Sequence, residues 1–374
     1  MFYAEWFFPL YFLLSTVYYV LQLTIKSCFW HPNIMKRRVI FAFSFITISC
    51  LLYVAFQLLR PLPVGNKNIE VGIPKGATFR EAVEIFSKEK LIRNKTLFLI
   101  VGRITGIDRK IRAGYYSIYR SMSLLDLLKI LRKGQIIEYE ITIVEGDSLI
   151  EIAEKLSEKG IADKEEFQEL SSDGDFLGSY TIDAPSLEGY LFPDTYKIPK
   201  GMDPEDALGI MINKMREKYS DKLKERASEL RLSEREVLTL ASIIEKEAVT
   251  DEERPLISAV YHNRLRKKIR LQADPTAIYG IKSSKEKITS DDLKRKTPYN
   301  TYTIKGLPPG PIASPGIKSI MAALFPSDVP YIYFVSNNDG THQFSVTMDE
   351  HQAAVKEYRK KKEAEKSTKA QEGT

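Results

Sequence analysis

An uncharged apolar stretch fills residues 39–59, between Arg38 and Arg60. Because about 20 consecutive apolar residues are enough for a helix to cross the hydrocarbon core of a bilayer, this stretch predicts a membrane span. A basic cluster of Lys36, Arg37 and Arg38 comes directly before it. Basic residues beside a span stay on the cytoplasmic side, so everything after Arg60 is expected on the extracytoplasmic (periplasmic) side of the cytoplasmic (inner) membrane.

The span is interpreted as a retained anchor, because no strong cleavage site of small residues follows it as in a signal peptide. Upstream, a second uncharged run covers residues 6–25. It is either another span or part of an upstream extension of the reading frame, since the sequence from Met35 has the form of a natural protein start. Residues 1–34 are therefore left as a hydrophobic extension, residues 35–60 as the anchor and residues 61–67 as a linker.

Composition excludes several classes of function. The chain has 374 residues, of which 44% are hydrophobic and 28% charged, which is typical of folded domains. The net charge of +6 comes from 55 basic and 49 acidic residues that are interspersed, so no nucleic-acid partner is expected. Cys28 and Cys50 both lie in the hydrophobic N-terminal region, and the four histidines are widely spaced. Neither a disulfide framework nor a metal site is predicted, and no cofactor is expected.

After the linker, a strand–turn–helix unit occurs twice, once from Val71 and again from Ile141. Both copies have a turn glycine, Gly76 and Gly146, followed by a small residue and a helix with matching apolar positions. Such short α+β units resemble LysM-type modules, which bind polysaccharides that contain N-acetylglucosamine. Residues 68–140 are therefore assigned to a LysM-like α+β module, with a purely structural α+β domain as the alternative.

Further along the chain, residues 232–250 have the pattern of a helix packed in a core. Ser233 and Glu236 form a capping box, in which each side chain bonds a backbone N–H of the first turn. The apolar residues that follow recur at the i, i+3, i+4, i+7 spacing of one helix face. They are Val237, Leu240, Ala241, Ile244 and Ala248.

Two carboxylates lie in the last turn of this helix. Glu247 falls between Leu240 and Ile243, whereas Glu245 lies on the other flank, about 160° away by helical geometry, so the two cannot act in one site. A carboxyl group among apolar side chains has a raised pKa and can serve as a general acid near neutral pH. The alternative is that both are ordinary acids of a helix whose apolar face is narrower.

Three further motifs, at residues 186–196, 260–280 and 299–316, combine aromatic rings with short polar side chains and rigid Pro/Gly loops. Aromatic rings stack on sugar faces, and the polar groups can bond hydroxyls, although a buried aromatic turn would have the same composition. The candidate substrate-binding residues are Glu188, Tyr190, Asp194, Asn263, Gln272, Asp274, Tyr299, Asn300 and Tyr302.

The chain carries, in order, the motifs EGYLFPDTY, ASIIEKEA, NRL, LQADPTAIYG, YNTYTIKGLPPGPIASPG and YFVSNNDGTHQFS. From about Arg38 to Tyr358 it resembles the YceG-like family of endolytic murein transglycosylases. The resemblance implies a membrane-anchored lyase that cuts the β-1,4 bond between N-acetylmuramic acid and N-acetylglucosamine in nascent peptidoglycan strands. The products end in 1,6-anhydro-N-acetylmuramic acid, and strand elongation stops. The catalytic acid of the family falls on Glu247.

The expected fold is α+β: a transmembrane helix, small LysM-like modules, and a mixed α/β catalytic domain that carries Glu247 on a helix. That domain is assigned to residues 141–355, with the second strand–helix unit at 141–185, and residues 356–374 to a charged, disordered tail.

The resemblance implies chemistry that needs a single carboxylate, whereas ordinary glycosidases use two. Glu247 would protonate the glycosidic oxygen and then deprotonate the muramyl C6 hydroxyl as it attacks C1. A hydrolase would need a second acid, for which Asp194 and Asp274 are the candidates. The other alternative is a noncatalytic, membrane-anchored scaffold that binds peptidoglycan for cell-wall synthases. Peptidoglycan synthases such as penicillin-binding proteins are the expected protein partners.

Overall fold

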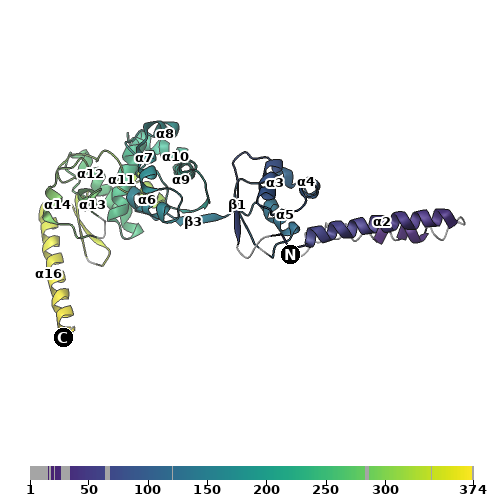
Figure 1. The fold of residues 1–374 in the computed structure, drawn as a ribbon. Helices are drawn as coiled ribbons and strands as arrows, with labels where there is room; N and C mark the ends of the chain where they lie inside the picture. The colour runs from purple at the N-terminus through teal and green to yellow at the C-terminus, as the bar shows by residue number, and fades with distance from the viewer. Residues whose placement is uncertain are drawn as a thin grey trace. The chain divides into compact units, whose positions relative to one another are not determined.

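The computed structural model describes residues 16, 18–20, 22–26, 34–63, 68–119, 121–282, 286–337 and 339–372. The chain forms two compact units (Figure 1). The N-terminal unit comprises Met1–Glu138 and Pro199–Gly201, and the C-terminal unit comprises Tyr139–Ile198 and Met202–Thr374. Most of the uncharged run at 6–25, and residues 64–67 of the linker, lie outside the described residues, so those two assignments stay predictions.

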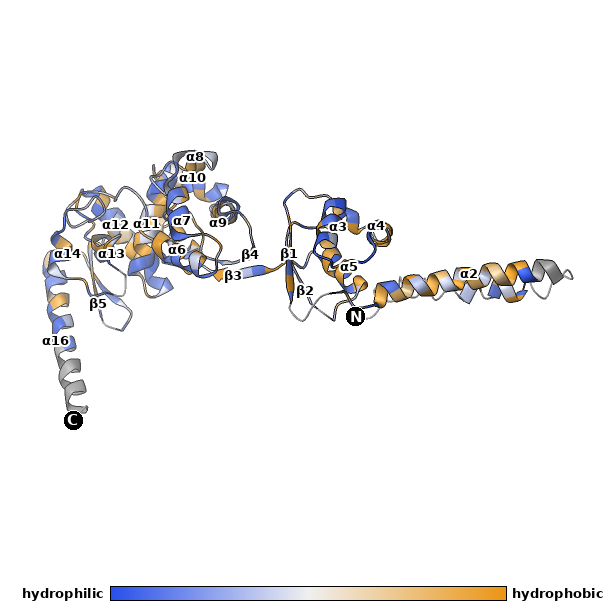
Figure 2. Ribbon diagram, viewed as in Figure 1, coloured by the Kyte–Doolittle hydropathy of each residue, from blue (hydrophilic) through white to orange (hydrophobic). Residues whose placement is uncertain are grey.

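The first long helix is α2 (Ile34–Leu59), which is apolar along most of its length (Figure 2). Its 22 residues from Arg38 to Leu59 are long and apolar enough to cross a membrane. Phe43 and Phe45 are both 72% exposed, which is costly for a helix in water and expected for one in lipid. Among the described residues, α2 is the one candidate membrane span.

The rest of the N-terminal unit is a small α+β module, which we define as residues 61–138. Its elements are β1 (Ile69–Ile73), α3 (Phe79–Lys88), α4 (Lys95–Ile104), the 3₁₀ turn η1 (Ile107–Arg109), β2 (Gly114–Ile118) and α5 (Leu124–Lys133). Strands β1 and β2 pair antiparallel, with Val71 opposite Tyr116. Both residues are buried, as are Phe86 and Phe98 of the helices, so the sheet and helices share one core.

The repeated strand–turn–helix unit predicted from the sequence is present in the structure. In the first copy β1 leads through Gly76 to α3, and in the second β3 (Glu138–Thr142) leads through Gly146 to α6 (Leu149–Glu158). Both glycines have a positive φ, 80° and 85°, which a residue with a Cβ rarely adopts. The glycines therefore recur because the same turn recurs.

The C-terminal unit is mostly helical, and its remaining elements are short. They are α7 (Lys164–Ser172), α8 (Gly174–Ser179), β4 (Thr195–Pro199), α9 (Pro204–Lys218), α10 (Asp221–Glu229), α11 (Glu234–Glu247), η2 (Asp251–Glu253), α12 (Arg254–Arg266), α13 (Asp274–Ile278), α14 (Ser290–Lys294), α15 (Ile317–Leu324), β5 (Tyr333–Ser336), β6 (His342–Ser345) and α16 (Met348–Glu372). Strand β3 pairs with β4, and β5 with β6. The mixed α+β class is as expected from the sequence.

Helix α11 lies at the centre of the C-terminal unit, packed against α10, α12, α13 and α15. All residues from Val237 to Ile244 are buried, including Thr239 and Ser242. The helix is therefore enclosed on all sides over two turns, and its buried surface is wider than the single apolar face that the sequence pattern indicated. The two hydroxyls are accommodated because each donates to a backbone carbonyl of the same helix.

The C-terminal tail differs from the expectation of disorder. Helix α16 packs against β5 and β6 and then continues past Lys356 to Glu372. This stretch is rich in Lys, Glu and Ala, which have high helix propensity, so the helix persists beyond the contacts that anchor its start.

A close contact in the N-terminal module gives a stability test. A Cβ added at Gly102 of α4 would lie 2.2 Å from the Phe79 ring, so Gly102→Ala should lower the stability of the module by about 1–3 kcal/mol despite the better helix propensity of alanine. Gly178→Ala in α8 is the matched control, because nothing lies within 4 Å of its added Cβ. Thermal melts by circular dichroism measure both. Equal melting of the two variants would contradict the packing of α4 on α3.

Candidate active site

Helix α11 places Glu247 at its last turn. The capping box predicted at its start is confirmed: the Glu236 N–H donates to Ser233 Oγ at 3.2 Å, and the Ser233 N–H donates to Glu236 Oε2 at 2.9 Å. The helix ends at Glu247, where Ala248 turns extended. A carboxylate at a helix C-terminus faces the negative end of the helix dipole, so its charged form is disfavoured.

The surroundings of Glu247 favour the protonated acid. Burial raises its pKa to about 7, and the negative charge of Asp274 acts in the same direction. Tyr261, a fully buried residue of α12, donates from its hydroxyl to Glu247 Oε1 at 3.1 Å, which together with the Asp274 backbone and Arg264 opposes part of that rise. The carboxyl group can therefore give up or accept a proton near neutral pH.

Two of the predicted binding residues lie beside this acid. Asp274 begins α13 and accepts a hydrogen bond from the hydroxyl of Tyr302. Burial and Asp274 raise the pKa of Tyr302, so its hydroxyl stays protonated and remains a donor. Asp274 also acts electrostatically on Glu247, which puts Glu247, Asp274, Tyr302 and Tyr261 in one network.

Gln272 joins the network through the backbone. Its φ of 50° is in the left-handed region, which is unfavourable for a residue with a side chain and is often found at functional loops. The loop is held by its neighbours: the Gln272 N–H donates to the Thr301 carbonyl at 3.3 Å, and the Ala273 N–H to Thr301 Oγ1 at 2.9 Å. The Gln272 side chain itself is exposed and available to a ligand.

Glu245 makes a different set of contacts, as expected from its opposite flank. Its Oε1 pairs with Arg254 Nη1 at 2.9 Å, and its Oε2 accepts from the Gly316 N–H at 2.8 Å. The side chains of both partners in this ion pair are less than a tenth exposed. Glu245 thus ties α11 to α12 and to the start of α15.

Two predicted binding residues are engaged in holding loops. Asn263 donates from Nδ2 to the carbonyls of Val329 and Tyr331, at 2.8 and 2.9 Å. Asn300 is fully buried and its Nδ2 faces three carbonyls of residues 292–295. These amides use their donors to hold the loops, and a role of either residue in binding substrate stays a prediction.

Glu188 is a buried acid of a second cluster. It accepts from the Tyr279 hydroxyl at 2.8 Å and from the Leu149 N–H at the start of α6, and burial raises its pKa to about 7. Tyr299 packs against Tyr279 with ring centroids 4.6 Å apart. No hydrogen bond joins Glu188 to Glu247 in the described part of the chain.

The other two predicted residues lie in different environments. Tyr190 is only 3% exposed and belongs to the core, so its ring cannot stack on a sugar as the structure stands. Asp194, just before β4, is partly exposed, with Lys214 Nζ 3.4 Å from its Oδ2. Asp194 therefore has an ion-pair partner of its own.

A groove of about 810 Å³ lies along the C-terminal unit beside the end of α11. Its lining includes Lys246 and Pro275, the chain neighbours of Glu247 and Asp274, and also Tyr279 and the α6 residues Glu151 and Lys155. A groove of this size can hold several sugar rings. Tyr279, which bonds Glu188, lines it, whereas Glu247 and Asp274 adjoin it only through their chain neighbours. Within the described residues, no group of His, Cys, Asp and Glu is arranged to hold a metal ion.

Comparison with known proteins identifies the family of this chain. The model of the YceG-like family matches residues 71–357, which is most of the chain. The match includes residues 71–138 of the module, α11 and all the loops around Glu247. This chain belongs to the YceG-like family.

Individual relatives match most of this chain. The endolytic murein transglycosylase of Bacillus subtilis (strain 168) is 31% identical over 321 residues, which cover 81% of this chain and 88% of that protein. The enzyme of the same name from Streptococcus pneumoniae serotype 2 (strain D39) is 29% identical, with 85% of this chain and 65% of that protein covered. A crystal structure of a YceG-like protein from Listeria monocytogenes is similar with a TM-score of 0.53 and 32% identity, and covers 77% of this chain and 99% of the other.

The two carboxylates of α11 should differ in what they contribute to stability. Glu245→Gln removes one of the two acids that pair with the buried Arg254 charge, the other being Asp251, and should lower the free energy of unfolding by about 1–3 kcal/mol. Glu247→Gln should not lower it.

The Glu247→Gln effect should also depend on pH. Because the folded-state pKa of Glu247 is raised from 4.5 to about 7, its favourable contribution is complete below pH 4.5 and is lost as the pH rises through 7. The free energy of unfolding of the variant should therefore rise relative to that of the wild type across this window, by on the order of 3 kcal/mol at most. Chemical denaturation at pH 4.5 and pH 8 measures the difference. A gain that does not change with pH would mean that the carboxyl is not desolvated.

Proposed function

We propose that this chain is an endolytic murein transglycosylase, a lyase that cuts the N-acetylmuramic acid–β-1,4–N-acetylglucosamine bond of peptidoglycan. The supporting observation is the Glu247 carboxyl, enclosed at the end of α11, hydrogen-bonded by Tyr261 and with a pKa raised to about 7. The names of the B. subtilis and S. pneumoniae relatives support the same reaction. Breaking nascent strands in this way would terminate their elongation.

In the proposed mechanism, Glu247 begins protonated and donates its proton to the glycosidic oxygen as the bond to C1 breaks. The carboxylate left behind then takes the proton of the muramyl C6 hydroxyl as that oxygen attacks C1, which closes the 1,6-anhydro ring and restores the acid. The 2-acetamido oxygen of the substrate shields the positive charge at C1. A pKa near 7 suits both steps, because the group is then close to half-protonated at neutral pH and can act as the acid and afterwards as the base.

Asp274 and Tyr302 would act around this step. The negative charge of Asp274 helps to keep Glu247 protonated before the reaction, and it stabilises the oxocarbenium-like charge that develops at C1. Tyr302 donates from its hydroxyl to one oxygen of the Asp274 carboxylate, so that oxygen is not free to take a proton from water. This arrangement favours transglycosylation over hydrolysis, the reaction in which Asp274 or Asp194 would serve as a second acid.

The proposed location is the cytoplasmic membrane, with α2 as the anchor and Lys36–Arg38 on the cytoplasmic side. Residues after Arg60 would then meet peptidoglycan on the outer side of that membrane. Residues 68–140, the predicted LysM-like unit, would bind glycan and help to recruit synthases. A noncatalytic scaffold remains the alternative function, but it has no use for a desolvated carboxyl group, which lowers the stability of the fold.

The products of the reaction test the proposal. The purified full-length chain should release from peptidoglycan fragments that end in 1,6-anhydro-N-acetylmuramic acid, and Glu247→Gln should slow their release by about 10²–10⁴-fold. Mass spectrometry of the fragments gives the answer. Fragments heavier by one water would show a hydrolase. Full activity of the folded Glu247→Gln variant would remove Glu247 as the acid.

The rate should also depend on pH in a way that reports Glu247. Because the acid must begin protonated, kcat/KM should fall as the pH rises above about 7. The Tyr261 hydroxyl lowers the pKa of Glu247, so Tyr261→Phe should move this decline to higher pH while reducing the maximal rate. Rates on peptidoglycan at pH 5 to 9 check both effects. If the fall in kcat/KM occurs at the same pH in Tyr261→Phe as in the wild type, a group other than Glu247 causes it.

A further inference from the structure

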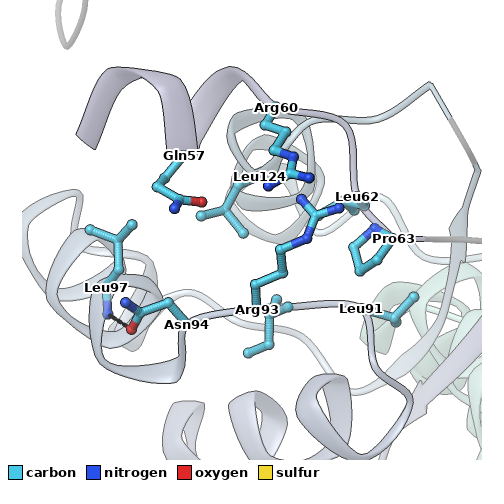
Figure 3. Close-up of a pocket in the computed structure, with 10 residues that line it drawn as sticks. Gln57, Arg60, Leu62, Pro63, Leu91, Arg93, Asn94, Leu97 and Leu124 are labelled. Atoms are coloured by element: carbon cyan, nitrogen blue, oxygen red, sulfur yellow. Dashed lines mark hydrogen bonds between the residues drawn. The ribbon is translucent and has the colours of Figure 1, made fainter. Parts of the chain in front are cut away.

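Two arginines lie next to each other at the C-terminal end of α2, the candidate membrane span. Arg60 directly follows α2, and Arg93 directly precedes the N-cap of α4. Figure 3 shows the two guanidinium groups turned toward one another in a pocket that Gln57 of α2 and Leu97 of α4 also line. Arg93 Nη1 donates to the Pro61 carbonyl at 3.2 Å, which holds its side chain in this position.

Neither arginine has a carboxylate within ion-pair distance in the part of the chain that the structure describes. The contrast with Lys95, two residues after Arg93, is clear, because Lys95 pairs with Glu84 at 2.6 Å. Two cations held side by side repel each other unless an anion lies between them. Guanidinium groups match the geometry of phosphate oxygens especially well, so the pair indicates a site for a phosphate group.

The length of α2 determines the depth at which the two arginines lie relative to a bilayer. A helix of 22 residues is about 33 Å long, which matches the hydrocarbon core, so the residue after Leu59 reaches the headgroup layer. No flexible linker separates the helix from the module. Leu58 and Leu62 are both buried in the core of the module, and the Leu62 N–H donates to the Met122 carbonyl at 2.8 Å. The module therefore begins at the membrane surface.

Helix α4 exposes an apolar face that begins at the same pocket. Leu97, Ile100 and Ile104 are spaced three and four residues apart on one side of the helix, whereas Phe98 and Gly102 are buried on the opposite side. Ile100 is 51% exposed and Ile104 is 79% exposed. Two isoleucines that point away from the core of so small a module are unfavourable in water and suited to the interfacial region of a bilayer.

We propose that the module rests on the surface of the membrane that α2 crosses. Arg60 and Arg93 bind the phosphate of an anionic phospholipid headgroup, and Ile100 and Ile104 of α4 enter the interface beside it. The inference rests on the proposed membrane anchor and is independent of the transglycosylase reaction. It gives the module a second attachment to the membrane, which would restrain its tilt about the end of α2.

Lipid binding by the full-length chain tests the arginine pair. The delipidated chain in detergent is titrated with phosphatidylglycerol, with phosphatidylcholine and with inorganic phosphate, and bound lipid is counted by native mass spectrometry. We expect selective binding of phosphatidylglycerol, and about tenfold or more weaker binding in Arg60→Gln/Arg93→Gln. Arg80→Gln/Arg109→Gln is the control with the same change in charge on exposed residues of the module, and it should bind within about twofold of the wild type.

The other outcomes contradict the site. Equal binding of the two lipids would show that the chain does not select the anionic headgroup. An equal loss of binding in Arg80→Gln/Arg109→Gln would show that the basic charge of the module attracts the lipid without a specific site. Inorganic phosphate that displaces phosphatidylglycerol at low concentration and binds as tightly would make the pocket a site for free phosphate and not for a membrane surface.

A fluorescent probe tests the apolar face. In a Cys28→Ser/Cys50→Ser background, Ile104→Cys carries a dye, and Tyr115→Cys serves as the control because β2 pairs with β1, at the end of the module away from α2 (Figure 1). In nanodiscs with spin-labelled lipid, quenching is expected at Ile104 only and should decrease in Arg60→Gln/Arg93→Gln. No quenching at Ile104 while the chain stays in the nanodisc would overturn the proposal and leave the anchor intact. Loss of the chain from the nanodisc would instead refute the anchor.

Discussion

The carboxyl group of Glu247 lies at the end of a helix whose residues from Val237 to Ile244 are all buried, and much of the C-terminal unit is arranged to keep it there. Helices α12, α13 and α15 surround α11, and the Tyr261 hydroxyl from α12 holds one oxygen of the acid. Taking a carboxyl group out of water is unfavourable for its charged form. The fold tolerates this because the group can stay protonated near pH 7, and that same tolerance makes it useful as an acid.

The position of each carboxyl relative to a helix end distinguishes the three buried acids. Glu247 is at the C-terminus of α11, where the dipole opposes its charge, and Tyr261 gives it a single side-chain donor. Glu188 accepts from a backbone N–H at the start of α6, where the dipole favours its charge, and from Tyr279. Glu245 has a full ionic partner in Arg254. Only Glu247 combines a raised pKa with a helix end that opposes ionisation, which is what a proton donor needs.

The sequence predicts what depends on neighbours in the chain. The capping box at Ser233, the repeated turn glycines, the apolar span and the divergence of Glu245 from Glu247 all follow from local spacing, and the structure has each of them. The roles of Asn263 and Tyr261 could not be predicted in this way. The Asn263 amide bonds carbonyls 66 and 68 residues further on, and Tyr261 meets Glu247 only because α12 folds back on α11. A polar residue in a motif has the same sequence signal whether it holds a loop or a ligand.

The same limit applies at the membrane. Hydropathy identifies α2, but it gives no sign that the folded module begins within three residues of Leu59, because that depends on the burial of Leu62 against residues far along the chain. This short connection has a physical consequence. A module that cannot move away from the bilayer must present some surface to it, and exposed apolar side chains on that surface then stabilise the arrangement. Ile100 and Ile104, out of place in a soluble domain, are expected in a module held at the interface.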